Sequence, residues 1–267
     1  MKKLEHLSEI CDLYDTYIID LWGVIHNGIN INTKALEAVE NLNSKNKRIV
    51  FLSNAPRPSK NVIKFLREMG LEEKFLKNVI TSGEAAINSI KNNKFGKKFY
   101  HLGPQRDSHI FEGLEKNKTS FDNCDYILCT GLFDEHEDLD FYKNLFTNNL
   151  SKKLICTNPD LIVHRGKEVE HCAGAIAEIY RSLGGKVIYF GKPHKEVYDL
   201  ILKNGEKNLI IGDNLNTDIK GANNLKIDSL FIYNGVHRSE ITKVEDLDKL
   251  LNIYGVKTQF FQKEFCW

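Results

Sequence analysis

Short apolar runs rich in β-branched and aromatic residues recur along the chain, and polar or glycine-containing sequence follows each of them. In chain order the runs lie at 17–19, 48–52, 79–81, 187–190, 209–211 and 229–232. Their length and composition predict buried strands of a mostly parallel sheet.

Segments with helical spacing lie between these runs. Asn32 and Thr33 are helix-start residues, and Leu36, Val39 and Leu42 then recur at helical spacing. Similar patterns predict further helices at 59–69, 83–91, 172–183, 197–201 and 241–251. The alternation of strands and helices predicts an α/β fold.

The middle of the chain carries a second set of strand-like runs. They lie at 99–102, 126–129 and 153–156, separated by helical or polar segments. Three strands with their connections are enough for a smaller α/β domain of its own. We therefore expect a discontinuous core domain at 1–82 and 187–267, with a second domain inserted at 83–186.

Composition and charge narrow the class of protein. A hydrophobic fraction of 42% and a charged fraction of 27% are ordinary for a soluble globular protein, and no apolar run is long enough to span a membrane. Thirty-seven basic and thirty-six acidic residues give a net charge of +1, so neither nucleic acid nor a membrane is expected as a partner. The polar start predicts a cytoplasmic protein, and a homo-oligomer is compatible with the sequence.

The six cysteines are scattered and contain no C-x-x-C pair, which favours reduced thiols over a disulfide framework. Cys124, Cys129 and Cys156 flank apolar runs and are most simply core residues.

Candidate chemistry follows four of the predicted core strands. The polar residues at these strand ends are Asp20, Ser53 with Asn54, Lys192, and Asp213 with Asp218. Because parallel strands place their carboxyl ends at one edge of a sheet, all four groups could meet around one ligand. A carboxylate nucleophile, hard oxygen ligands for Mg²⁺ and a lysine with small donors form a coherent set for binding a phosphoryl group. Taken singly, each residue is equally well a turn or capping residue.

The ordered set resembles the haloacid dehalogenase superfamily over nearly the whole chain. The motifs that carry the resemblance are Asp20-Leu21-Trp22-Gly23-Val24, Ser53-Asn54, Gly191-Lys192-Pro193 and Gly212-Asp213 followed by Thr217-Asp218. The size and place of the insertion, with Thr157-Asn158-Pro159-Asp160 and Ala173-Gly174-Ala175, are similar to class IIA members, which include sugar-phosphate, pyridoxal-phosphate and nitrophenyl-phosphate phosphatases. The resemblance implies a doubly wound, mostly parallel core sheet with a smaller α/β cap domain.

The resemblance also implies a role for each motif residue. Asp20 would be the nucleophile that forms an aspartyl-phosphate, Ser53 and Asn54 would orient the phosphoryl group, and Lys192 would neutralise charge. The ligands of Mg²⁺ would be Asp20, Asp213, the backbone carbonyl of Trp22 and, in support, Asp218.

Trp22 departs from the family pattern, because it stands where these phosphatases have a second aspartate. That aspartate protonates the leaving oxygen and then activates water, whereas an indole N–H cannot exchange a proton at neutral pH. His26 is the nearest titratable candidate to replace it, with a packing or substrate-contact role as the alternative.

The inserted domain carries an unusual polar cluster of His164, Arg165, His171 and Cys172. Arg165 could hold an anionic substrate. A zinc site from His164, His171 and Cys172 is a weaker interpretation, because no fourth ligand has suitable spacing.

These patterns predict a Mg²⁺-dependent hydrolase that acts on a small phosphorylated metabolite through Asp20. Two alternatives stay open because of Trp22: a phospho-ligand-binding protein with weak or no turnover, and an enzyme that cleaves a bond other than a phosphate ester.

Overall fold

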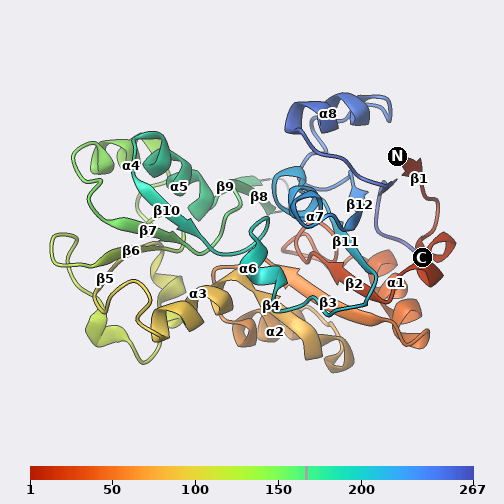
Figure 1. The fold of residues 1–267 in the computed structure, drawn as a ribbon, viewed down its shortest axis with the longest axis horizontal. Coiled ribbons are helices and arrows are strands. Elements are labelled where there is room, and N and C mark those ends of the chain that lie inside the picture. The colour runs from red at the N-terminus through yellow and green to blue at the C-terminus, as the bar shows by residue number, and fades with distance from the viewer. Residues whose placement is uncertain (166–167) are drawn as a thin grey trace.

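Two α/β lobes lie side by side in the structure, a computed structural model that describes residues 1–165 and 168–267 (Figure 1). The side chains of residues 164 and 165 also lie outside the description. Among the described residues, one sheet has seven strands, a second has four, and two further strands form a separate hairpin. Both chain termini lie in the lobe of the seven-stranded sheet (Figure 1).

The larger sheet is parallel throughout and confirms five of the predicted strands. Its order is β1 (Lys2–Lys3), β13 (Phe260–Gln262), β12 (Asp228–Ile232), β11 (Asn208–Gly212), β2 (Thr16–Ile19), β3 (Arg48–Ser53) and β4 (Val79–Thr81). The short strands β1, at the edge of the sheet, and β13, next to it, were not predicted, because neither has an apolar run of strand length.

Helices cover both faces of this sheet, as a doubly wound sheet requires. Along β2, Tyr17 and Ile19 face a core formed with α1 (Thr33–Ser44) and α2 (Ser59–Glu68). Ile18 faces the other way, toward α6 (Lys195–Tyr198) and α7 (Lys220–Leu225). This alternation is the period of two that a strand imposes on its side chains. A further helix, α8 (Asp246–Tyr254), begins five residues later than predicted.

The smaller sheet is also parallel and has the order β10 (Lys186–Tyr189), β7 (Lys153–Cys156), β6 (Tyr126–Cys129) and β5 (Phe99–Leu102). One face packs against α4 (Leu139–Phe146) and α5 (Ala173–Ser182), and the other against α3 (Ser82–Lys91). Cys124, Cys129 and Cys156 are buried in this lobe as free thiols, in agreement with the sequence.

The placement of the strand at 187–190 in the core sheet was wrong. β10 pairs with β7 in the smaller sheet, because its side chains belong to that lobe on both faces. Val187 and Tyr189 pack against the core on the α5 side, and Ile188 and Phe190 pack against the core on the α3 side. The domain boundaries at 82/83 and 186/187 stay a prediction, although strand pairing places β10 with the inserted lobe.

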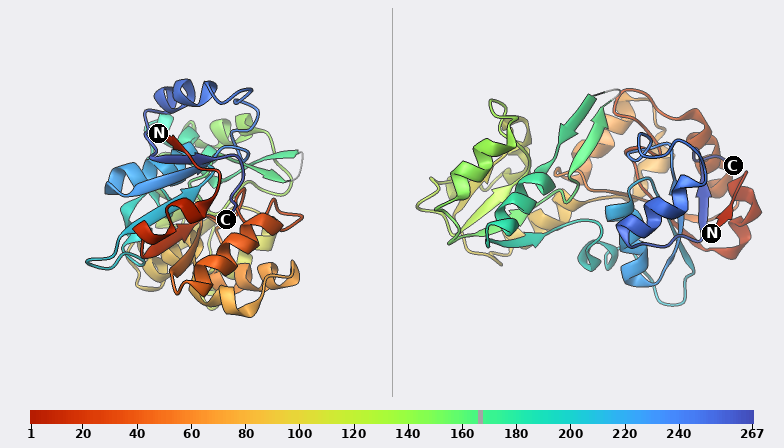
Figure 2. Two further views of the ribbon diagram at one scale, coloured as in Figure 1. Left: turned by 90° about the vertical axis from the view of Figure 1, so that its right-hand side faces the viewer. Right: turned by 90° about the horizontal axis from the view of Figure 1, so that it is seen from above.

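A two-stranded antiparallel hairpin lies between the lobes (Figure 2). It consists of β8 (Ile162–Arg165) and β9 (Glu168–His171), which the sequence did not predict as strands. None of the helices in the described part of the chain is both long and apolar enough to cross a membrane.

Candidate active site

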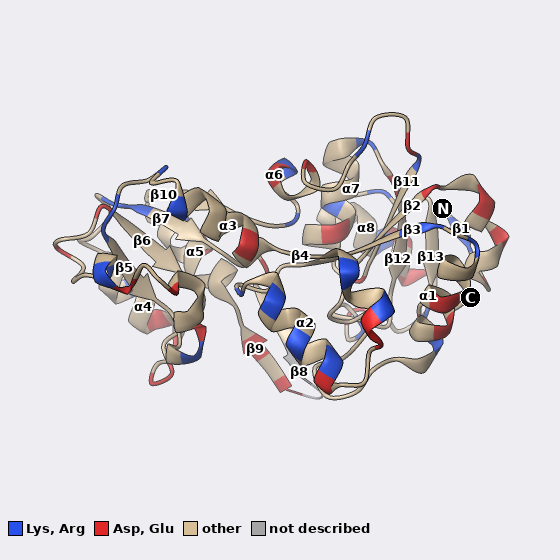
Figure 3. Cartoon of the chain, turned by 90° about the horizontal axis from the view of Figure 1, so that it is seen from below, with Lys and Arg blue, Asp and Glu red and all other residues tan. Residues whose placement is uncertain are grey.

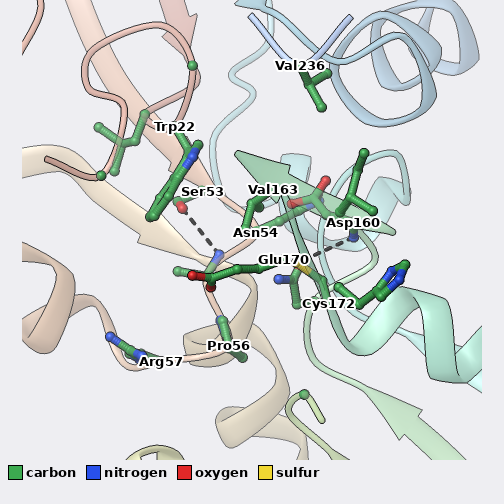
Figure 4. Close-up of a pocket in the computed structure, with 18 of the residues that line it drawn as sticks. Trp22, Ser53, Asn54, Pro56, Arg57, Asp160, Val163, Glu170, Cys172 and Val236 are labelled. Atoms are coloured by element: carbon green, nitrogen blue, oxygen red, sulfur yellow. Dashed lines mark hydrogen bonds between the residues drawn. The ribbon is translucent and has the colours of Figure 1, made fainter. Parts of the chain in front are cut away.

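A cavity of about 1220 Å³ lies between the two sheets (Figure 4). Asp20, Ser53 and Asp213, which follow or end strands of the larger sheet, line one side. Thr130 and Asn158, which follow strands of the smaller sheet, line the other. Because parallel strands present their loops at the carboxyl edge, two sheets that face each other build one site from both sides.

The predicted motif residues gather at this cavity. Asp20, Trp22, Ser53, Asn54 and Asp213 line it. Lys192 and Asp218 are buried against them, with 3% and 1% of their surface exposed. The predicted substrate-binding side chain of Arg165 lies outside the described residues, so its role stays a prediction.

A lysine between two carboxylates forms the centre of the site. Lys192 Nζ donates to Asp20 Oδ1 at 2.6 Å and to Asp218 Oδ1 at 2.7 Å. Burial opposes the charged ammonium, but the carboxylates of Asp20, Asp218 and Asp160 together hold the pKa of Lys192 well above its usual value. Lys192 is therefore a fixed cation beside the predicted nucleophile.

Asp213 is held tightly against the loop that follows Asp20. The N–H of Val236 donates to Asp213 Oδ2 at 2.7 Å. Gly23 has φ +87°, and a Cβ there would lie 2.0 Å from the same oxygen. Only glycine allows both this backbone conformation and this approach. The Trp22 main chain, one residue earlier, is thereby brought to the carboxylates.

The carboxylates form a site that fits a divalent cation. One oxygen from each of Asp20, Asp213 and Asp218 lies within 4.8 Å of the others, and all three side chains are buried. Burial and the neighbouring Asp218 raise the pKa of Asp213 to about 8, and burial raises that of Asp20 well above its usual value. Lys192 alone does not offset so many buried negative charges, whereas a hard divalent cation would.

Ser53 ends β3 beside this centre and Asn54 follows it, and their side chains make different contacts. Ser53 Oγ accepts a hydrogen bond from the N–H of Ala55 at 3.2 Å, which leaves its hydroxyl proton for a ligand. The Asn54 side chain instead bonds the main chain of Lys192. A phosphoryl contact from Asn54 would therefore come from its backbone N–H rather than its amide.

The indole of Trp22 packs at the pocket wall against His26. Their ring centroids are 5.1 Å apart at 69°, and His26 in turn contacts Phe65 at 5.6 Å. The N–H of Gly28 donates to His26 Nδ1 at 3.0 Å. Burial lowers the pKa of His26 to about 4, so the ring is neutral at pH 7 and is not an acid there. These contacts favour the packing role.

Asp160 is a pocket residue to which the sequence reasoning assigned no role. It lies four residues after β7 and accepts from Asn54 Nδ2 at 3.2 Å and Asn214 Nδ2 at 3.5 Å. Burial and Asp218 raise its pKa, and Lys192 opposes them, with a result of about 6. The signal that could have found it is the one used for the larger sheet, a carboxylate shortly after a buried strand.

The remaining polar cluster does not form a described metal site. Within the described side chains, the three aspartates are the group with metal-ligating spacing, while His171 is exposed and Cys172 is buried. His164 is outside the described side chains, so the zinc interpretation stays untested. Charges of both signs are interspersed over the two lobes, as the near-zero net charge predicts (Figure 3).

Fold and site together define a class IIA haloacid dehalogenase-like protein: a doubly wound sheet whose aspartate–lysine centre faces a smaller α/β cap lobe. Two family models match the chain, haloacid dehalogenase-like hydrolase at residues 17–116 and HAD-hydrolase-like at residues 189–251. The chain belongs to the haloacid dehalogenase-like hydrolase family.

Individual relatives match over most of their length. A haloacid dehalogenase-like hydrolase from Brucella suis is 30% identical, with a TM-score of 0.87 over 98% of this chain and 99% of that one. The 4-nitrophenylphosphatase from Thermotoga maritima is 28% identical, with a TM-score of 0.71 over 96% of each chain. An acid sugar phosphatase from Staphylococcus haemolyticus is 28% identical over 87% of this chain and 90% of the relative.

Proposed function

We propose that the protein is a Mg²⁺-dependent phosphatase of a small phosphorylated metabolite, with Asp20 as nucleophile. The observation that carries the proposal is the buried group of Asp20, Lys192, Asp213 and Asp218 at the cavity wall. Relatives named acid sugar phosphatase and 4-nitrophenylphosphatase support phosphomonoester chemistry.

In the proposed reaction an oxygen of Asp20 attacks phosphorus. The new Asp20 O–P bond forms as the bond to the leaving oxygen breaks, and that oxygen takes a proton from solvent. Ser53 Oγ–H and the backbone N–H of Asn54 orient the phosphoryl oxygens, while Lys192 offsets their charge. Water then attacks the aspartyl-phosphate, which releases inorganic phosphate and restores Asp20.

Asp20, Asp213 and the carbonyl of Trp22 would hold the metal ion, with Asp218 in support. When bound, the ion supplies positive charge that favours the ionised form of the carboxylates and offsets the phosphoryl charge. This matters because the site without a cation raises the pKa of Asp20 and so favours its protonated, non-nucleophilic form.

Trp22 favours a second candidate, a protein that binds a phosphorylated ligand with little turnover. An absent general acid/base typically lowers the rate by about 10²–10⁴-fold, and the neutral His26 beside Trp22 does not replace it. An enzyme that cleaves a bond other than a phosphate ester would also need no general acid at the position of Trp22. A panel of organohalides and phosphonates tests this alternative.

The deciding experiment is turnover of a phosphomonoester panel with Mg²⁺ by the natural protein, Asp20→Asn and Trp22→Asp. We expect turnover by the natural protein, none by Asp20→Asn, and a rise of about 10²-fold or more in Trp22→Asp. Full activity in Asp20→Asn would refute the nucleophile. No turnover by the natural protein, together with thermal stabilisation by inorganic phosphate, would favour the binding protein.

A further inference from the structure

Lys192 reaches its partners from an unexpected direction. It lies three residues after the end of β10, which pairs with β7 of the smaller sheet, whereas Asp20 and Asp218 belong to the larger sheet and its connections. Neighbouring strands therefore do not set the distance between the ammonium and Asp20. Some other contact must fix the Lys192 main chain against the larger lobe.

The side-chain amide of Asn54 makes this contact. Its Oδ1 accepts from the N–H of Lys192 at 2.8 Å, and its Nδ2 donates to the carbonyl oxygen of Lys192 at 3.1 Å. Asn54 is 3% exposed, so both bonds are buried. Gly191 permits the approach, because a Cβ at that position would lie 2.5 Å from Asn54 Oδ1.

Asp160 supports the orientation of the Asn54 amide that binds Lys192. Its Oδ1 accepts from Asn54 Nδ2 at 3.2 Å. If the amide were reversed, Asn54 Oδ1 would face both the Asp160 carboxylate and the Lys192 carbonyl, and Nδ2 would face the Lys192 N–H. All three contacts would be repulsive, so the carboxylate adds to the preference of the Lys192 main chain for the orientation that binds Lys192.

We propose that Asn54 and Asp160 are positioning residues for Lys192, which act by clamping its main chain so that the ammonium reaches Asp20. The inference rests on the proposed function, because it assumes that Lys192 serves the phosphoryl group. It assigns the Asn54 side chain to the lysine and leaves the backbone N–H of Asn54 to the ligand. Both positioning residues act through Lys192 rather than on the substrate.

The chain contains a matched control for this clamp. In α7, Asn223 Nδ2 donates to the carbonyl oxygen of Lys257 at 2.7 Å, and Asn223 Oδ1 accepts from the N–H of Lys257 at 2.8 Å. The pattern of hydrogen bonds is the same as at Asn54, although these bonds lie at the surface, and Lys257 takes no part in the site. Asn223→Ala therefore measures the cost of losing such a clamp without disturbing the catalytic lysine.

The experiment compares Asn54→Ala, Asn54→Asp and Asn223→Ala for kcat, KM, melting temperature and thermal stabilisation by inorganic phosphate. We expect both alanine variants to melt at lower temperature. Only Asn54→Ala should lose kcat, by about 10²-fold, since a misplacement of about 1 Å costs that much, with a smaller change in KM. Asn54→Asp keeps the size of the side chain but replaces the Nδ2 donor by an oxygen that faces the Lys192 carbonyl, so it should lose kcat even if Asn54→Ala does not fold.

A charge exchange tests the part played by Asp160. In the double variant Asn54→Asp/Asp160→Asn, an amide again faces a carboxylate, so kcat should recover by about tenfold relative to Asn54→Asp alone. Equal kcat in Asn54→Ala, Asn223→Ala and the natural protein would overturn the clamp. So would the absence of any recovery in the double variant.

The phosphate measurement separates this inference from the proposed function. If the natural protein binds phosphate but turns nothing over, the phosphatase assignment fails. The clamp then stands if Asn54→Ala alone loses phosphate stabilisation, and it falls if Asn223→Ala loses as much. A natural protein that neither turns over the panel nor binds phosphate would overturn both.

Discussion

Asp213→Asn is expected to stabilise the metal-free protein while it removes the predicted metal site. The Asp213 carboxyl is 4% exposed, and burial with the neighbouring Asp218 raises its pKa from an ordinary value of 3.8 to about 8. At pH values between these two pKa values, Asp213 therefore holds a proton in the folded protein that it has lost in the unfolded chain. The contribution of this proton to the free energy of unfolding is fully present below the pKa of the unfolded state. It is lost as the pH rises toward the pKa of the folded state.

The size of the effect follows from the two pKa values. Each pH unit between them costs about 1.4 kcal/mol of unfolding free energy. From about pH 5 to about pH 7.5 the natural protein should therefore lose about 3 kcal/mol that an asparagine, which does not titrate, would keep. An asparagine Oδ1 can still accept the hydrogen bond from the N–H of Val236, so the substitution leaves that contact in place.

Urea unfolding of both proteins in a chelator, at the two pH values, measures this difference. Asp213→Asn should be the more stable protein at about pH 7.5, with the gap narrowing toward about pH 5. Adding Mg²⁺ should stabilise the natural protein and leave Asp213→Asn nearly unchanged, because the ion binds the folded carboxylates. If the free energy of unfolding depended on pH in the same way in the two proteins, the pKa of Asp213 would not be raised by burial, and this reasoning would be refuted.

Three further substitutions test the same centre. Gly23→Ala should destabilise the protein by about 1–3 kcal/mol and weaken Mg²⁺ binding, because the new Cβ would meet Asp213. Titration calorimetry measures the Mg²⁺ affinity. Gly70→Ala is the control, because Gly70 has a similar backbone conformation with nothing within 4 Å of a Cβ, and this variant should keep full Mg²⁺ affinity. Lys192→Met should lower the free energy of unfolding in urea by about 3–5 kcal/mol near neutral pH, since it leaves buried carboxylates unpaired. A smaller loss near neutral pH than at acid pH would contradict this reasoning. His26→Ala should lower the melting temperature yet leave the pH profile of kcat unchanged between about pH 6 and about pH 8, because the ring is already neutral there.

Much of the site was predictable because it obeys a local rule. Asp20, Ser53 and Asp213 each end or directly follow a buried apolar run, and parallel strands bring such positions to one edge. The apolar runs also predicted five strands of the larger sheet. The polar hairpin β8–β9 and the short strands β1 and β13 were not predicted, because tertiary contacts rather than an apolar run hold them.

Sheet membership was the part that local pattern could not decide. The run at 187–190 is equally suited to either sheet, and its pairing with β7 depends on the cores to which Val187 and Ile188 contribute. The order of the motifs along the chain is the same in both cases, so motif spacing does not indicate which sheet the strand joins.

The position of Lys192 nevertheless agrees with the prediction, and the reason lies in the loop rather than in the strand. Gly191 has φ +108°, and its missing side chain lets Asn54 reach the Lys192 main chain. With that segment fixed, the ammonium lies between Asp20 and Asp218 although β10 belongs to the smaller sheet. Contacts between loops thus bring the predicted site residues together, which is why their grouping could follow from a wrong strand assignment.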